Sequence, residues 1–276
     1  MNLLAVENVT QRFGGLTAVD AVDFAIEAGT ISAIIGPNGA GKTTLFNLIS
    51  GFQKPLGGRI VFEGRDITGE EPHRIAAAGI VRTFQLVQLF PDLTALQNVE
   101  AGCHLRGSGG VWAALARTRR ARRELDEASA IARELLTFVG LADSAHSAAG
   151  SLPYGKQRLL EVARAMAAGP RLLLLDEPAA GLNAVETEHL AQVLRALASR
   201  GITVLLIEHD MSLVMRVASR IVVLDFGRKI AQGTPAEVQN DPAVLEAYLG
   251  GVEGLEDVGD VGAAEAVGAL RRANNA

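Results

Sequence analysis

Apolar residues recur along the chain in two alternating patterns, short β-favouring runs and longer stretches with helical spacing. Over residues 9–35, apolar positions at 22, 24 and 26 and the run 31–35 are separated by glycine turns, which predicts strands. From Thr43 the apolar positions follow helical spacing until Gly51, and residues 59–62 form another strand-like run. We therefore expect a strand, a loop and a helix around residue 36, followed by a further strand.

The middle of the chain is predicted to be a helical insertion. Thr94 and Gln97 form a capping box, and residues 94–141 carry helical patterns, broken by a predicted loop at 107–110. Helices and strands alternate again after residue 152, with helices to 168 and over 185–199, and strands over 172–175, 202–207 and 221–224. This alternation is typical of a parallel sheet. A second capping box, Thr234 with Glu237, predicts a final helix pair reaching Leu249.

Composition narrows the class of protein. The 276 residues carry a net charge of -5 and an isoelectric point near 5.6, which argues against a nucleic-acid partner. Cys103 is the only cysteine, which fits a reducing compartment. We see no secretory signal, and no apolar run approaches the roughly 18 residues that a membrane span needs. Residues 251–276 are rich in Gly, Ala and acidic residues, so we expect a disordered tail.

Five arginines between residues 117 and 123 allow two interpretations. A solvated helix face is the simpler one, and contact with a membrane surface or an acidic partner is the alternative. Both stay open at this point. The cluster consists of Arg117, Arg119, Arg120, Arg122 and Arg123.

Residues 36–43 read GPNGAGKT, a phosphate loop that follows a predicted strand and opens a predicted helix, the context that this motif requires. Its glycines let the backbone wrap closely around phosphates, and the helix N-terminus directs partial positive charge at them. We expect Lys42 to span the β and γ oxygens and the Thr43 hydroxyl to ligate Mg²⁺. The predicted ATP site comprises Gly36, Pro37, Asn38, Gly39, Ala40, Gly41, Lys42, Thr43 and Thr44.

An acidic pair ends the predicted strand 172–175. Asp176 is expected to hold the metal through its water shell, and Glu177 to polarise the attacking water, a role worth roughly 10²- to 10⁴-fold in rate. His209 follows the next strand and so reaches the same carboxyl edge of the sheet, where it is placed to sense the γ-phosphate. On its own, His209 would be interpreted as a structural residue at a strand end. Together these residues predict that the chain hydrolyses ATP.

The order and spacing of these motifs resemble the ATP-binding subunit of an ATP-binding-cassette (ABC) transporter over about residues 3–250. The resemblance implies an α/β fold: a P-loop NTPase (RecA-like) core with a parallel sheet, an N-terminal antiparallel β subdomain and an inserted α-helical signature subdomain. The implied divisions are residues 1–91 and 156–250 for the two parts of the core, 92–155 for the helical subdomain ending in the signature segment, and 251–276 for the tail.

The same resemblance implies roles for further residues. Gln85, in the segment RTFQ, fits the Q-loop glutamine, which touches the metal or water and links the core to the helical insertion. Phe13 fits the aromatic residue that stacks on adenine, with a buried strand aromatic as the alternative. Asn183 stands where the D-loop more often has aspartate, a change expected to alter coupling across subunits. The D-loop is Ala180, Gly181, Leu182 and Asn183, and the implied metal set is Thr43, Gln85 and Asp176.

The segment that resembles the family signature LSGGQ departs from it. In the family the signature serine binds the γ-phosphate held by the opposite subunit, and Pro153 offers neither a hydroxyl nor a backbone N–H. We therefore hypothesise that the ATP site receiving this signature is the weaker of two in a heterodimer. The segment is Leu152, Pro153, Tyr154, Gly155, Lys156 and Gln157.

Several fragments narrow the resemblance to one of the two ATPases of branched-chain amino acid importers: RTFQ followed by LF at 89–90, the Tyr-Gly signature, PAAGLN at 178–183, and DP at 241–242 leading to AYLG at 247–250. The resemblance implies ATP and Mg²⁺ as cofactors, a second homologous ATPase subunit, two integral-membrane permeases and, indirectly, a periplasmic substrate-binding protein. It places the chain at the cytoplasmic face of the bacterial inner membrane. Importers of urea, short amides or aromatic acids stay open as alternatives.

Two rival functions come from other classes. A soluble ABC ATPase acting on nucleic acid usually carries two cassettes or a long coiled-coil insertion, and this chain has one cassette and a net negative charge. A catalytically inactive regulatory cassette is suggested only by Pro153. The intact set of Lys42, Asp176, Glu177 and His209 argues against it.

Overall fold

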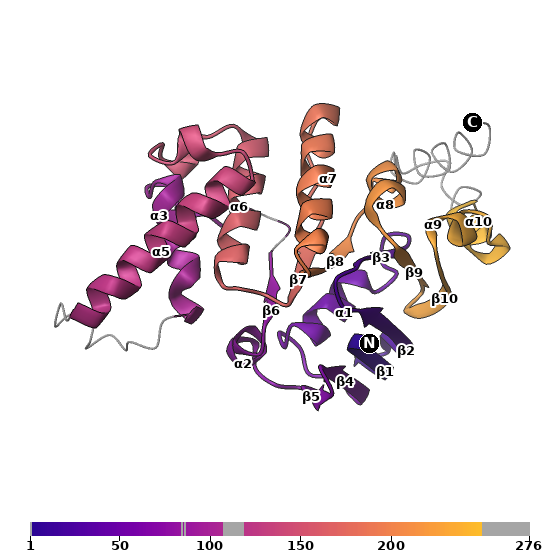
Figure 1. Cartoon of the computed structure of the whole chain (residues 1–276). Coiled ribbons are helices and arrows are strands. Elements are labelled where there is room, and N and C mark those ends of the chain that lie inside the picture. The colour runs from indigo at the N-terminus through magenta and orange to yellow at the C-terminus, as the bar shows by residue number, and fades with distance from the viewer. Residues whose placement is uncertain (1, 84, 86, 107–118, 250–276) are drawn as a thin grey trace.

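The computed structural model describes residues 2–83, 85, 87–106 and 119–249, and Figure 1 shows their arrangement. An antiparallel sheet has the strand order β2-β1-β4-β5, formed by β1 (Asn2–Phe13), β2 (Leu16–Glu27), β4 (Gly57–Phe62) and β5 (Arg65–Asp66). The sequence patterns indicated strands within residues 9–35 and none before them, whereas β1 begins at Asn2. Its apolar alternation is interrupted at Glu7 and at Asn8, which has a φ of 49° and lies at an irregularity in the pairing.

A second sheet contains the remaining strands in the order β10-β9-β3-β8-β7-β6. All its neighbouring strands run parallel except β10, which pairs antiparallel with β9 at the edge. The expected parallel sheet is therefore confirmed. Its strands are β3 (Ile31–Ile35), β6 (Ile80–Arg82), β7 (Leu172–Asp176), β8 (Thr203–Ile207), β9 (Arg220–Asp225) and β10 (Arg228–Gly233).

Alternating side chains of the parallel sheet enter two separate cores. Leu172 and Leu174 join a core that also contains the antiparallel sheet and α1 (Lys42–Ile49), so α1 lies between the two sheets. Leu173 and Leu175 point to the opposite face, where a second group of helices packs. Burial on both faces explains why these strands read as continuous apolar runs.

The helices on that second face are α3 (Ala95–Gly102), α5 (Arg119–Phe138), α6 (Tyr154–Ala167), α7 (Ala184–Ser199) and α8 (Met211–Val217). In Figure 1, α3, α5 and α6 form a group to one side of the sheet. The C-terminal pair α9 (Pro235–Gln239) and α10 (Pro242–Leu249) matches the expectation, and Thr234 and Glu237 form the predicted capping box. Short 3₁₀ turns lie at Cys103–Arg106, Ala142–Ser144 and Ala149–Ser151.

The apolar patterns of the sequence did not predict β6, β10, α8 or the short helix α2 (Pro72–Ala77). Each is short, and β10 is polar and partly exposed because it is an edge strand, so its apolar signal is weak. The predicted loop at 107–110, Arg117 and the predicted tail lie outside the described residues. Within the described part of the chain, none of the helices has the length and apolar character needed to cross a bilayer.

Candidate functional site

The phosphate loop lies between β3 and α1, as predicted. Gly36 (φ 150°), Gly39 (φ 80°) and Gly41 (φ 98°) have backbone angles that other residues rarely adopt. A Cβ atom on Gly36 would overlap the carbonyl of Leu224, and one on Gly41 would overlap the carbonyl of Ala18. The loop is therefore pressed against β9 and β2, and only glycine fits at these two positions.

Lys42 begins α1 and folds back over its own loop. Its ammonium donates hydrogen bonds to the carbonyl oxygens of Gly36 at 2.7 Å and Pro37 at 2.9 Å. Burial lowers the pKa of Lys42, and the nearby carboxylates of Glu177 and Asp176 act in the opposite direction. Lys42 thus reaches from the phosphate loop to the acidic pair.

Asp176 is the last residue of β7, and its carboxylate pairs with Arg82 at the end of β6. Arg82 Nη2 lies 2.7 Å from Asp176 Oδ2, and the two side chains are only 6% and 5% exposed. Arg82 also donates to Asn47 Oδ1 at 2.7 Å and to Ser50 Oγ at 3.0 Å, both at the end of α1. The predicted metal carboxylate is therefore tied by one arginine to the helix that the phosphate loop opens.

Glu177 has a left-handed backbone conformation (φ 48°), and its carboxylate bonds two predicted site residues. Gln85 Nε2 donates to Glu177 Oε2 at 2.9 Å, and His209 Nε2 lies 3.1 Å from Glu177 Oε1. Three segments that are far apart in the sequence thus meet at one carboxylate, at the carboxyl edge of the sheet. A carboxylate held by two polar side chains, with 19% of its side chain exposed, can orient a water molecule and accept its proton.

Phe13 ends β1 and is 47% exposed, so the alternative of a buried strand aromatic is wrong. The strand that follows the turn after Phe13 contacts the phosphate loop through Ala18, and the backbone N–H of Gly227 donates to the Ala40 carbonyl at 3.1 Å. The exposed ring is therefore on a hairpin that reaches the loop, as adenine stacking would require.

The signature segment leads into α6, and Pro153 is its N-cap residue, with no side-chain cap. The residues of this segment contact α7 and the 3₁₀ turn Ala142–Ser144, which precedes α6 in the chain. A Cβ on Gly155 would overlap Glu186 of α7, Lys156 Nζ lies 3.3 Å from Ser144 Oγ, and Gln157 donates to the Leu152 carbonyl. Pro153 and Tyr154 are exposed.

The D-loop lies between Glu177 and α7. The Ala180 N–H donates to the Glu177 carbonyl at 3.2 Å, so the D-loop begins in the turn that carries the predicted base. Asn183 is the N-cap of α7 and accepts from the backbone N–H groups of Val185 and Glu186. Asparagine satisfies this cap as well as aspartate does, which gives Asn183 a structural role.

A buried pair of charged side chains on α6, which the sequence patterns did not predict, bonds the Q-loop. Arg158 Nη2 donates to the Gln85 carbonyl at 2.6 Å, and Glu161 Oε1 accepts from the Gln88 N–H at 3.4 Å. The two side chains pair with each other at 3.3 Å and are each 4% exposed. Charged residues on the core-facing side of a predicted helix are unusual. This departure from the amphipathic pattern of α6 is the sequence signal that would have identified Arg158 and Glu161.

Donors for a metal–nucleotide complex are present. Thr43 supplies a hydroxyl and Asp176 a carboxylate, the hard oxygen ligands that Mg²⁺ takes alongside substrate phosphates. In the described residues no cluster of three His, Cys, Asp or Glu side chains is positioned to bind a metal alone. The residues thus fit Mg²⁺ carried with a nucleotide, which would supply positive charge for phosphoryl transfer.

A phosphate loop facing an acidic pair and a histidine, on a sheet with a helical insertion, defines a nucleotide-hydrolysing cassette. Residues 19–180 match the family model described as "ABC transporter", and the chain belongs to this family of ATPases. Residues 228–254 match the model described as "Branched-chain amino acid ATP-binding cassette transporter".

Curated relatives cover nearly the same length. The high-affinity branched-chain amino acid transport ATP-binding protein BraF of Pseudomonas aeruginosa is 47% identical over 90% of this chain and 98% of its own. Its counterpart LivG of Salmonella typhimurium is 45% identical with the same coverage.

Solved structures confirm the fold. A nucleotide-free ATP-binding cassette from an ABC transporter is 34% identical, with a TM-score of 0.79, over 90% of this chain and 99% of that one. A cassette in a dimeric post-hydrolysis state bound to ADP and Pi is 27% identical, with a TM-score of 0.70, over 84% of this chain and 98% of that one.

Proposed function

We propose that this chain energises the import of branched-chain amino acids by hydrolysing ATP at the cytoplasmic face of a bacterial inner membrane. The observation that carries the proposal is its similarity to transport ATP-binding proteins of that name, over 98% of their length. Its partners are then a second homologous ATPase subunit, two integral-membrane permeases and a periplasmic binding protein. The amino acid is recognised by those partners, so specificity is not encoded in this chain.

The site residues divide the chemistry between them. Lys42 and the amides of the phosphate loop would hold the phosphates, Phe13 would stack on adenine, and Thr43, Asp176 and Gln85 would hold Mg²⁺, which would supply positive charge for phosphoryl transfer. Glu177 accepts a proton from the attacking water, and His209, at 3.1 Å from the Glu177 carboxylate, fixes the orientation of that carboxylate. Asp176 ends β7, Glu177 follows it and His209 lies just after β8, so these three side chains share the carboxyl edge of the parallel sheet.

The site is half of a complete one. Asn38, Gly39 and Thr43 are exposed on the phosphate loop, and Pro153 and Tyr154 are exposed where α6 begins. A second cassette would cover both surfaces, with each signature segment closing the nucleotide site of the other subunit. The dimeric state of a cassette 27% identical to this chain supports such an assembly.

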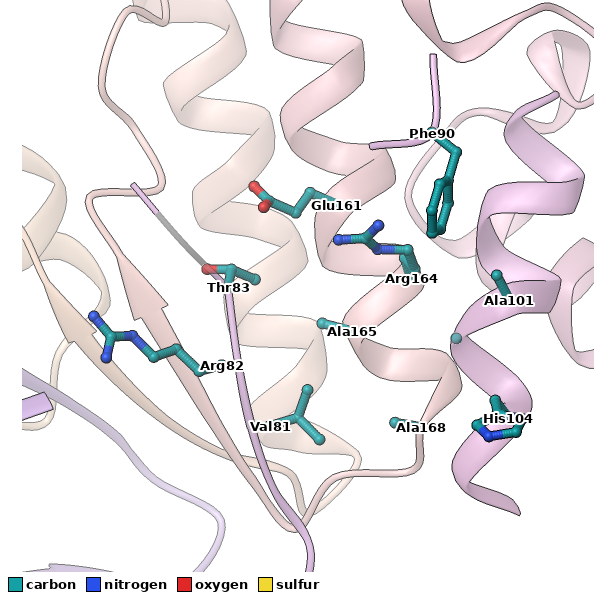
Figure 2. Close-up of a pocket in the computed structure, with 11 residues that line it drawn as sticks. Val81, Arg82, Thr83, Phe90, Ala101, His104, Glu161, Arg164, Ala165 and Ala168 are labelled. Carbon is teal, nitrogen blue, oxygen red and sulfur yellow. The ribbon is translucent and has the colours of Figure 1, made fainter. Parts of the chain in front are cut away.

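A groove beside the Q-loop suits contact with the permeases. It has a volume of about 410 Å³ and lies between β6, α3 and α6, with Phe90, His104, Glu161 and Arg164 around it (Figure 2). Arg164 lies over the Phe90 ring at 5.8 Å. Glu161 accepts from the Gln88 N–H and pairs with Arg158, which donates to the Gln85 carbonyl, so a partner that displaces Glu161 would act on the segment around Gln85.

The test is reconstitution of the complex in proteoliposomes with each candidate binding protein. We expect ATP hydrolysis to rise when the binding protein carries leucine, isoleucine or valine, and Lys42→Ala to abolish the rise. Stimulation only by urea, a short amide or an aromatic acid would support the alternative substrates. Hydrolysis stimulated by nucleic acid and indifferent to permeases would refute a role in transport.

A further inference from the structure

A buried carboxylate next to the site has no role in the mechanism above. Glu208 follows β8 directly and is 3% exposed. Burying a carboxylate costs free energy unless hydrogen bonds replace its water. Glu208 Oε1 accepts from the Ala179 N–H at 2.7 Å, and Oε2 accepts from the N–H groups of His209 at 3.0 Å and Asp210 at 3.3 Å. The carboxylate therefore bonds two different loops.

The two loops are those that carry the predicted base and the predicted γ-phosphate sensor. Ala179 lies two residues after Glu177, in the turn closed by the Ala180 N–H and the Glu177 carbonyl. His209 follows Glu208 directly, and its ring returns to the Glu177 carboxylate at 3.1 Å. These contacts form a closed circuit. The Glu177 and His209 side chains meet directly, and the Glu208 carboxylate bonds the backbone of both His209 and Ala179, which returns to the Glu177 turn.

This circuit of contacts explains how Glu177 keeps an unfavourable left-handed backbone conformation. A non-glycine residue at φ 48° is held there only when its surroundings fix it. The Glu177 N–H donates to the Ile207 carbonyl at 3.0 Å, which anchors the start of the turn, and Glu208 anchors it two residues further on. One anchor is the last residue of β8 and the other is the residue that follows it, so the base is positioned relative to the strand end that leads to His209.

We propose that Glu208 is a positioning residue for ATP hydrolysis, which holds the Glu177 turn and His209 in register through its three backbone hydrogen bonds. The inference rests on the proposed role of Glu177 as the base. Glu208 is buried and its two oxygens accept from backbone N–H groups, so it is assigned a positioning role and no part in the chemistry. Its loss should therefore lower kcat and leave the KM for ATP unchanged, because the phosphate loop is held by other contacts.

The experiment compares Glu208→Gln with wild type in the full complex, at about pH 8. A glutamine side chain has one acceptor oxygen, so it cannot accept from both loops, and its amide would face one of their N–H groups. Since misplacement by about 1 Å can cost roughly 100-fold in rate, we expect kcat to fall by about 10- to 100-fold. Glu208→Asp keeps the charge but is too short to reach both loops, and should show the same fall.

Thr203→Val is the matched control. Thr203 is buried at the other end of β8, and its hydroxyl accepts from the Gly29 N–H at 2.9 Å. This variant also loses one acceptor for a backbone N–H, so it should lower the melting temperature without changing kcat. A fall in kcat for Thr203→Val equal to that of Glu208→Gln would overturn the proposal, because general destabilisation would then explain both.

A variant that combines Glu208→Gln with Glu177→Gln distinguishes a positioning role of Glu208 from a general loss of folded protein. If Glu208 acts through Glu177, then adding Glu208→Gln to Glu177→Gln leaves the residual turnover of Glu177→Gln unchanged. Multiplication of the two effects, or unchanged kcat in Glu208→Gln and Glu208→Asp, would overturn the inference. Absence of hydrolysis by the wild-type complex would overturn the proposed function and this inference with it.

Discussion

Arg82→Met tests whether the buried ion pair with Asp176 stabilises the fold through charge compensation. The two side chains are 2.7 Å apart and almost inaccessible, so removal of the guanidinium leaves a buried carboxylate without its counter-charge. Breaking such a pair from one side typically costs about 3–5 kcal/mol. For a chain of this size, each kcal/mol shifts the melting temperature by about 2–4 °C, so we expect a loss of roughly 6–20 °C.

Urea denaturation of Arg82→Met, Asp176→Asn and the double variant completes a mutant cycle. The double variant should be more stable than Arg82→Met alone, because it carries no uncompensated charge, although it still lacks the contacts of Arg82 with the rings of Phe46 and Phe52. A loss below about 1 kcal/mol in Arg82→Met, or a double variant no more stable than that single variant, would refute charge compensation.

Three further substitutions and one pH dependence test the site. Lys42→Ala should abolish phosphate release by the complex, and measurable turnover would contradict its role. Glu177→Gln should bind ATP and hold the dimer closed, seen as an ATP-dependent shift in size-exclusion chromatography; undiminished hydrolysis would falsify its assignment as the base. Pro153→Ser should raise the ATPase rate of the complex by restoring a hydroxyl and an N–H at the signature, and an unchanged rate would remove the hypothesis of a weaker site. Burial raises the pKa of Glu208 from 4.5 to about 7, so its contribution to stability is fully present below 4.5 and is lost as pH rises through about 7. Relative to Glu208→Gln, wild type should lose up to about 3 kcal/mol between pH 4.5 and pH 8 in urea denaturation, and parallel curves would contradict this.

Local patterns were sufficient to predict much of this fold. The glycine spacing of residues 36–43 requires backbone angles and close approaches that only a tight loop provides, and the structure has them at Gly36 and Gly41. The continuous apolar runs of β7 and β8 predicted a sheet covered on both faces, and the capping boxes at Thr94 and Thr234 fixed two helix starts. These signals are strong because they depend only on near neighbours in the chain.

The contacts that organise the site depend instead on tertiary distance. Arg82 and Asp176 are 94 residues apart, and Glu208 bonds Ala179 from 29 residues away, so no spacing rule connects them. A polar residue within an apolar pattern was the available signal in each case, but such a residue is equally consistent with an exposed strand end. The early start of β1 was missed for a related reason, because polar residues at 7 and 8 interrupt its alternation.

The hydrogen bonds from α6 to residues 85 and 88 also connect this helix to the proposed catalytic carboxylate. Arg158 donates to the Gln85 carbonyl and Glu161 accepts from the Gln88 N–H, so a displacement of the helix would act on both residues together. Gln85 Nε2 donates to the Glu177 carboxylate at 2.9 Å, so a rotation of α6 that pulls on the Gln85 carbonyl would act on a hydrogen-bond donor of that carboxylate. The position of this helix is therefore coupled, through Arg158 and Gln85, to the hydrogen bonding of the Glu177 carboxylate.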